Sequence, residues 1–437
     1  METLPATRGE RQATNKVMRY CLRCCYPENA QPTIIFDEEG VCSGCRLLES
    51  RPTINWEERG RWLKDLLKEY KAKARAANNP YDCIIPVSGG KDSTYQVYLM
   101  KKVYGMNPLL ATYNHLFNTK VGLRNLENMV KQFSCDLIRF SSNPDSVRKI
   151  ARYMLEKVGD VTWHYHAGIM TFPIQMAVKY KIPLMIWGEE GFSELTGMFN
   201  QDDMVEFTKK KRQEHDMRGF EPEDLINDAE CPLDRKDLAP FFYPSDEEIE
   251  QLGLRGIYLS NYLSWNGKQH AEKMIKEYDF ETARDRDRTF NIYDKVDDIH
   301  ANGVHDYLKY LKFGYGRATD DASTEIRHAR MTREEGIDMV VKHDPARPRD
   351  LDLLLEFVGI TETQFEGLVE HLRDGRIWEK NPKTGKWRTK DNIGNHRNDP
   401  GVDKHRLPIK EKGHFIVNSK NKLADPHILE GGGYNYL

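Results

Sequence analysis

A run of small, hydroxyl-bearing and charged residues follows the apolar segment 82–87 and opens a helical pattern. It reads Ser88, Gly89, Gly90, Lys91, Asp92 and Ser93. Glycines let a backbone approach phosphate oxygens closely, and the N–H groups at the start of a helix favour negative charge. The two serine hydroxyls and the lysine add hydrogen-bond donors and positive charge. The pattern predicts a pyrophosphate cradle at a strand-to-helix turn, and therefore an ATP-using protein; an ordinary Gly-Gly turn is the alternative.

Four short apolar segments alternate with helical patterns from residue 81 onward. Such alternation predicts an α/β fold with a doubly wound parallel sheet. Ligands bind these sheets beyond the carboxyl ends of the strands, where polar residues follow each segment. Tyr113, Gly188 and Glu189 are therefore expected to join the cradle around a nucleotide, although a solvated turn would also explain Glu189 and Glu190. The expected strands are 82–87, 108–113, 136–140 and 182–187.

Within the cradle, three residues are the candidate catalytic groups: Lys91, Asp92 and Ser93. A lysine offsets the charge of phosphate oxygens, and a carboxylate beside a polyphosphate is a suitable ligand for Mg²⁺. Asp92 is therefore the candidate magnesium ligand, and the expected cofactors at this site are ATP and Mg²⁺.

Four of the eight cysteines form two closely spaced pairs, Cys21-x-x-Cys24 and Cys42-x-x-Cys45. Doubled spacing of this kind predicts a four-thiolate zinc ribbon, with a short strand at 33–36 between the pairs. Bound zinc would supply folding energy that so small a unit lacks. Disulfides and a redox or sulfur-carrying pair are the alternatives. The remaining cysteines, Cys25, Cys83, Cys135 and Cys231, are expected to be packing residues.

The rest of the chain divides by its helical patterns. A charged amphipathic helix at 56–77 is expected to link the ribbon to the sheet, and a helical stretch at 144–181 should break at Pro173. Alternation stops near residue 280, and helices are then expected at 324–342, 351–358 and 362–373. The expected units are a zinc ribbon 1–50, a linker helix 51–80, a nucleotide domain 81–280, a helical region 281–375 and an extended or partly disordered arm 376–437.

The bulk composition excludes some classes of protein. The chain has 437 residues with 39% hydrophobic and 30% charged residues, and its net charge is -3. That balance gives no indication of a nucleic-acid partner. No apolar run is long enough to cross a membrane, and the first residues lack the pattern of a signal peptide. We therefore expect a cytoplasmic protein without a membrane partner.

The cysteine pairs, the cradle, the strand end Ile186-Trp187-Gly188-Glu189 and the run 311–320 together resemble the N-acetyl sugar amidotransferases. These are PP-loop ATP pyrophosphatases of bacterial surface-polysaccharide, lipopolysaccharide O-antigen and nonulosonic-acid pathways. The likeness covers about residues 18–370, and the run Phe313-Gly314-Tyr315-Gly316-Arg317-Ala318-Thr319-Asp320 is its most restrictive part. The C-terminal arm has no counterpart in the resemblance.

The resemblance implies a reaction in which ATP transfers AMP to the oxygen of an acetamido group, and ammonia then replaces that oxygen. The product would be an acetamidino sugar, released with AMP and pyrophosphate. The sequence shows no nucleophile pattern for glutamine hydrolysis, so a separate glutaminase is the expected source of ammonia. The family suggests a partner pair similar to the glutaminase and cyclase subunits of histidine biosynthesis. The substrate would be a free or nucleotide-linked sugar.

Candidate sugar-binding residues lie outside the cradle. Tyr258 and Asn261 belong to an aromatic and amide patch with Tyr262 and Trp265, which suits stacking on a sugar face. Packing of the same residues in the core is the alternative. Arg317 could hold a carboxylate or phosphate with two hydrogen bonds, assisted by Lys312. His164 and His166 would either handle protons or be satisfied structural residues.

Two other functions remain open at this point. A tRNA sulfur-transfer enzyme would also combine a PP-loop, zinc knuckles and adenylation of a carbonyl oxygen, but it would require catalytic cysteines near the nucleotide. The segment 162–166 contains none, and the acidic net charge disfavours tRNA. A non-enzymatic docking platform would need a degenerate nucleotide site, which the intact cradle motif does not indicate.

Overall fold

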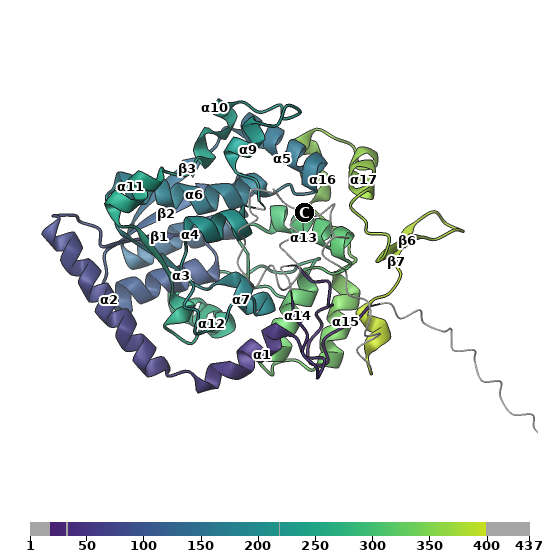
Figure 1. Cartoon of the computed structure of the whole chain (residues 1–437), viewed down its shortest axis with the longest axis horizontal. Coiled ribbons are helices and arrows are strands. Elements are labelled where there is room, and N and C mark those ends of the chain that lie inside the picture. Colours follow the sequence, from purple (N-terminus) through teal and green to yellow (C-terminus); the bar gives the residue numbers. More distant parts are fainter. Residues whose placement is uncertain (1–17, 32–33, 218, 399–437) are drawn as a thin grey trace, which may run out of the picture.

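The computed structural model describes residues 18–31, 34–217 and 219–398. Its five-stranded parallel sheet lies among helices in the left half of Figure 1. The strand order is β3-β2-β1-β4-β5. The first strand, β1, is therefore in the middle of the sheet; β2 and β3 are added on one side of it, and β4 and β5 on the other. The predicted doubly wound parallel α/β class is confirmed. The strands are β1 Cys83–Pro86, β2 Pro108–Asn114, β3 Asp136–Ser141, β4 Leu184–Trp187 and β5 Arg255–Tyr258.

The fifth strand was not among the expected ones. Strand β5 pairs with β4 through Ile186 and Ile257, and a long insertion of short helices separates the two strands in the chain. Because of this insertion, the sequence between β4 and β5 does not show the regular alternation of strand and helix, and β5 was not predicted. As a result, Tyr258 lies at the carboxyl end of a strand and contributes to the crevice from there. The helices of the insertion are α7 Gly191–Thr196, α8 Lys209–Lys211, η3 Arg212–Asp216, α9 Pro222–Ile226, α10 Arg235–Leu238, η4 Ala239–Phe241 and α11 Asp246–Leu252.

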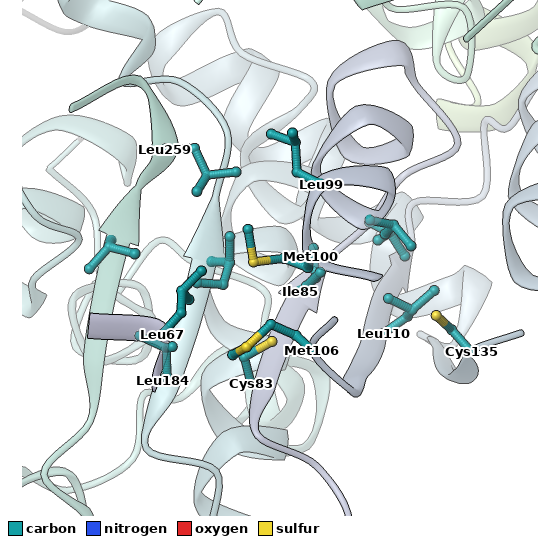
Figure 2. Packing of buried hydrophobic residues seen from close by; sticks show 14 of the residues in the cluster. Leu67, Cys83, Ile85, Leu99, Met100, Met106, Leu110, Cys135, Leu184 and Leu259 are labelled. Carbon is teal, nitrogen blue, oxygen red and sulfur yellow. The ribbon is translucent and has the colours of Figure 1, made fainter. Parts of the chain in front are cut away.

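Alternate strand residues pack against helices on opposite faces of the sheet. On one face, Cys83 and Ile85 of β1 pack with Leu67 of α2 and Met100 of η2 (Figure 2). On the other face, Ile84 packs with α5 and α6. Burial of both faces explains why β1, β2 and β4 are largely apolar. The edge strand β3 is partly exposed and contains Asp136 and Arg139. The first face is covered by α2 Trp56–Ala76, α3 Lys91–Tyr98, η2 Leu99–Val103 and α4 Lys120–Phe133, and the second by α5 Pro144–Val158 and α6 Trp163–Lys179.

The expected helix break at Pro173 is wrong. The chain breaks earlier, where Gly159 ends α5 with a left-handed φ of 65°, and α6 then runs through Pro173. Proline removes one backbone hydrogen bond from a helix. The neighbouring Phe172 and Ile174 are buried in the core, and this packing outweighs the local preference.

Helices α13 to α17 form the C-terminal region beside the sheet (Figure 1). The charged stretch expected at 324–342 is two helices, because Ala329 has a positive φ of 54° and Thr332 caps the second helix. Helix α12, Gly267–Tyr278, precedes the region and packs on α3. The five helices are α13 Ile299–Phe313, α14 Arg317–Arg327, α15 Arg333–His343, α16 Leu351–Val358 and α17 Glu362–Glu370.

The first part of the expected C-terminal arm is folded. Strands β6, Trp378–Lys380, and β7, Trp387–Thr389, form an antiparallel hairpin, and the short helix η6, Ile393–His396, packs beside α15. Trp378 and Ile393 are buried. Burial of these apolar side chains explains why the segment is not extended. Residues 399–437 of the expected arm lie outside the described residues.

The N-terminal unit consists of the two cysteine knuckles, helix α1, Ser43–Ser50, and the short helix η1, Arg51–Thr53. Phe36 forms an isolated bridge with Cys42, and the first part of the strand expected at 33–36 lies outside the described residues. Across the described ranges, no helix is both long and apolar enough to span a bilayer.

Candidate active site

The cradle connects β1 to the start of α3. Gly89 has a φ of +95°, and a side-chain carbon on it would lie 2.3 Å from the carbonyl oxygen of Gly122, so only glycine fits. Gly90 is the residue before the helix, and its N–H donates to the Ser88 hydroxyl at 3.2 Å. Ser93 closes the turn by donating to the Gly90 carbonyl at 3.0 Å. The loop therefore presents a helix N-terminus flanked by hydroxyl groups, which is an arrangement suited to phosphate.

Lys91 is buried at the start of α3 between two carboxylates. Its Nζ lies 2.5 Å from Oδ2 of Asp92 and 3.2 Å from Oδ1 of Asp294. Burial alone would lower the pKa of Lys91, but Asp294 and Asp92 hold that pKa well above its usual value. The lysine is therefore a permanent positive charge at the cradle.

The carboxylates around this lysine have shifted pKa values. Burial raises the pKa of Glu189 well above its usual value, and the charge of Asp92 raises it further. Burial and, to a lesser degree, Asp294 also raise the pKa of Asp92 against the opposing effect of Lys91. Such clustered and perturbed carboxylates are typical of functional sites. Asp92 and Glu189 have the ligand chemistry that Mg²⁺ prefers.

A segment from the C-terminal region, 294–298, lies across the cradle. The N–H of Thr119 donates to the Asp297 carbonyl at 3.0 Å, and a side-chain carbon on Gly90 would lie 2.9 Å from Oδ1 of Asp297. Burial and the neighbouring Asp298 raise the pKa of Asp297 to about 7. Sequence reasoning missed this segment, and the only indication of it was the density of acidic residues where the strand-helix alternation stops.

Two adjoining cavities open beside the cradle. The first, of about 300 Å³, is lined by Lys91, Glu189, Asp294 and residues of α14. The second, of about 390 Å³, is lined by Trp187, Tyr258 and residues of α13. Both volumes lie in the range of small-molecule sites. The cavities share one wall, formed by Glu189, Gly191, Leu195, Lys295 and Arg317.

The structure brings some of the expected sugar-binding residues together. Tyr258, Lys312 and Arg317 all line the second cavity. Lys312 donates to the Gly159 carbonyl at 3.0 Å. Asn261 does not line this cavity, and its amide donates to the Val205 carbonyl at 2.8 Å.

Arg317 is already engaged within the protein. Its Nε and Nη2 donate to the two carboxylate oxygens of buried Asp306 at 3.0 and 2.8 Å. A bidentate pair of this kind fixes the guanidinium plane. The N-terminus of its helix, α14, is held in turn by Asp344, which accepts from the N–H groups of Gly316 and Ala318 at 2.8 and 2.9 Å.

Two residues expected at the nucleotide lie in packed surroundings instead. Tyr113 is buried in the core on the α6 side of the sheet, and its hydroxyl lies 2.9 Å from that of Ser142. A side-chain carbon on Gly188 would lie 2.5 Å from Nε2 of Gln96, so this glycine allows α3 to approach β4. Neither residue lines the two cavities.

The two histidines of α6 have different surroundings. His164 is buried, and burial, aided by His115, lowers its pKa to about 3, so it is neutral at physiological pH. His166 lines the second cavity and contacts the Thr162 carbonyl at 3.1 Å through Nδ1. Of the pair, only His166 is placed to meet a ligand.

The four cysteines Cys21, Cys24, Cys42 and Cys45 lie within 4.8 Å of one another through their sulfur atoms and are buried. The Cys21–Cys45 and Cys24–Cys42 sulfur distances are 3.9 and 3.6 Å. A tetrahedron with Zn–S bonds of about 2.3 Å has edges of about 3.8 Å. The geometry therefore fits a structural zinc ion. Cys25, Cys83 and Cys135 are buried packing residues, and Cys231 is partly exposed.

Arg327 connects this cysteine cluster to the cavity wall. Its Nη2 lies 3.5 Å from the sulfur of Cys42, and its Nη1 donates to the carbonyls of Glu194 and Leu195 at 2.9 and 2.8 Å. Leu195 belongs to α7 and lines both cavities. The ribbon thus supports a wall of the candidate active site.

Fold and site together define a parallel α/β protein with a PP-loop-like cradle. Residues 272–393 match a family model described as "LPS biosynthesis protein WbpG-like, C-terminal domain". The match includes the segment 294–298 and the run 313–320, which is the most restrictive part of the resemblance described above.

Two further similarities also cover only part of the chain. An uncharacterized protein of Methanocaldococcus jannaschii is 25% identical over 118 residues, which are 27% of this chain and 41% of that protein. The chain thus spans less than half the length of that relative. The structure of NMN synthetase from Francisella tularensis is 15% identical and has a TM-score of 0.25, with coverage of 34% of this chain and 60% of that one.

Proposed function

We propose that this protein uses ATP to convert the acetamido group of a bacterial surface sugar into an acetamidino group. The observation that carries the proposal is the shared wall between two cavities, one at the cradle and one lined by aromatic and charged residues. This arrangement supports the transfer of a group from a nucleotide in the first cavity to an acceptor in the second. The family match to lipopolysaccharide biosynthesis proteins supports a sugar as the acceptor.

The chemistry has two steps. The acetamido oxygen attacks the α-phosphorus of ATP, an O–P bond forms, and pyrophosphate leaves with the electrons of the broken P–O bond. Ammonia then adds to the acyl carbon and loses a proton, and AMP leaves with the former acetamido oxygen. The product is an amidinium group. Adenylation is needed because an amide oxygen is a poor leaving group.

The residues of the cradle have distinct roles in this proposal. Ser88, Gly89, Gly90 and Ser93 would bind the departing pyrophosphate through N–H and hydroxyl groups. Lys91 would offset its charge. Asp92 and Glu189 would hold Mg²⁺, which when bound neutralises phosphate charge. Ammonia would come from a separate glutaminase in the cytoplasm, and a cyclase-like subunit would be a further partner.

A nucleotide-product assay tests the reaction class. Purified protein is incubated with ATP, ammonium chloride and a panel of free and UDP-linked acetamido sugars, and the nucleotides are separated by chromatography. AMP and pyrophosphate in equal amounts support the proposal. ADP and inorganic phosphate would contradict it.

Sulfur transfer to tRNA is less well supported than amidination. No cysteine is among the residues that line either cavity in the described part of the chain. Cys83 is fully buried in β1, and burial raises its pKa well above the usual value, which disfavours the thiolate.

A further inference from the structure

Lys295 stands out in the wall that the two cavities share. It lines both of them, as do Glu189 and Arg317, the other charged residues of the wall. Arg317 is paired with Asp306, whereas the side chain of Lys295 forms no hydrogen bond or salt bridge with any described residue. It is therefore a cation available to a ligand at the junction of the two cavities.

Other cations that line the cavities are occupied. Lys211 contacts Glu190 and Asp216 at 3.3 and 3.2 Å. Lys309 contacts Asp320 at 2.8 Å. Buried or partly buried cations are normally paired in this way. Lys295 makes no such direct side-chain contact within the described part of the chain, although its charge interacts with those of Asp294 and Asp306. An anionic ligand would supply the direct contact.

The backbone of Lys295 is strained. Its φ is +48°, in the left-handed region, which costs a residue with a side chain free energy that glycine does not lose. Among the described non-glycine residues with positive φ, it alone lines the two cavities. Strained residues of this kind cluster at functional sites.

The chain around Lys295 is fixed to the cradle. Asp294, the preceding residue, contacts Lys91 at 3.2 Å. Thr119 donates its hydroxyl to the Val296 carbonyl at 2.5 Å. The backbone of Lys295 is therefore held in place on both sides, at the wall that the two cavities share.

We propose that Lys295 is a catalytic residue whose ammonium binds the non-bridging oxygens of the α-phosphate while AMP moves from pyrophosphate to the acceptor. This inference rests on the proposed function. In this proposal the cradle binds the β- and γ-phosphates of ATP, and Lys295 binds the α-phosphate, which is transferred to the acceptor. No new covalent step is required, because the lysine supplies charge and hydrogen bonds only.

The test is calorimetric titration of the full chain with two probes, AMP and pyrophosphate. Lys295→Met and Lys295→Gly should weaken AMP binding roughly 10- to 100-fold, the loss of a charge-assisted contact. Pyrophosphate binding should stay within about two-fold, since that ligand occupies the cradle. Lys295→Arg should retain most of the AMP affinity because the positive charge remains.

The Lys295→Gly variant distinguishes a loss of ligand binding from a loss of protein stability. Lys295→Gly should raise or maintain the melting temperature, because glycine accepts a positive φ without strain. The matched control is Lys181, an exposed lysine with a φ of 53°. Lys181→Gly should change neither affinity.

Unchanged AMP affinity in Lys295→Gly, or equal losses for both probes, would overturn the role of Lys295 and leave the proposed function intact. Failure of the wild-type protein to bind either probe would overturn the proposed function itself, together with this inference.

Discussion

Nζ of Lys91 lies 3.2 Å from Oδ1 of Asp294, although one residue belongs to the cradle and the other to the C-terminal region. The contact makes the region that matches the lipopolysaccharide biosynthesis family model part of the charge balance of the cradle. The cradle is thus completed by residues that a PP-loop motif alone does not contain.

Asp294→Asn should tighten pyrophosphate binding and reduce stability. Removing the carboxylate leaves the charge of Lys91 less neutralised, so the affinity for pyrophosphate should increase several-fold. The free energy of unfolding of the unliganded protein should fall by about 1–2 kcal/mol. Thermal unfolding with and without pyrophosphate measures both effects. If pyrophosphate raises the melting temperature of the variant no more than that of the wild type, the Asp294 contact does not weaken the attraction between Lys91 and phosphate.

Asp297→Asn should change how stability depends on pH. The folded pKa of Asp297 is about 7, above the value of about 3.9 expected in the unfolded chain. The folded protein therefore binds the extra proton between pH 4 and 7, and stability falls as pH rises through that window. The neutral amide avoids this loss, so the variant should gain on the order of 2 kcal/mol over the wild type at pH 8 and less at pH 5.

Urea unfolding at the two pH values measures this difference. Asp65→Asn, a change at an exposed position on α2, is the control and should show no such pH-dependent gain. Parallel pH profiles for Asp297→Asn and the wild type would mean that Asp297 is ionised in the folded protein throughout the range.

Cys42→Ser should remove the metal and weaken the active site together. We expect about one zinc per wild-type chain by elemental analysis, because four thiolates at tetrahedral spacing form a closed site. The substitution also removes the contact between Arg327 and the Cys42 sulfur. Arg327 donates to a backbone carbonyl of α7, so the position of α7 should become less fixed. ATP turnover should therefore fall with zinc content, whereas Cys231→Ser should retain both. Zinc-free wild-type protein with full activity would contradict the assignment.

Asp92→Asn should abolish pyrophosphate release while the fold remains intact. The carboxylate pairs with Lys91 and is the expected Mg²⁺ ligand. A loss of about 100-fold or more in turnover is expected. Circular dichroism checks the fold, and Asp65→Asn serves as the control. Turnover at the wild-type rate would place the reaction at another site.

The sequence predicted the sheet and the cradle because both depend on local pattern. Short apolar strands, the glycine pair before α3 and the cysteine spacing all have direct physical causes that act over a few residues. The same reasoning failed where packing between residues far apart in the sequence determines the structure. Pro173 lies inside α6 because its neighbours pack in the core. Strand β5 was missed because a long insertion separates it from β4.

The candidate site was predicted only in part, for the same reason. Residues of the cradle follow from one motif, but Asp294, Lys295 and Asp297 reach it through folding of the C-terminal region onto the cradle. No local pattern reports such a contact. Tyr113 also shows the limit of the strand-end rule, since its side chain points into the core and not into the crevice.

The fate of the acetamido oxygen tests the central claim most directly. An accepted sugar labelled with ¹⁸O in its acetamido group is incubated with ATP and ammonium, and the products are weighed by mass spectrometry. The account predicts one ¹⁸O atom in the phosphate of AMP, none in pyrophosphate, and a sugar in which nitrogen has replaced that oxygen. Unlabelled AMP, or label retained in the sugar, would contradict adenylation of the acetamido oxygen.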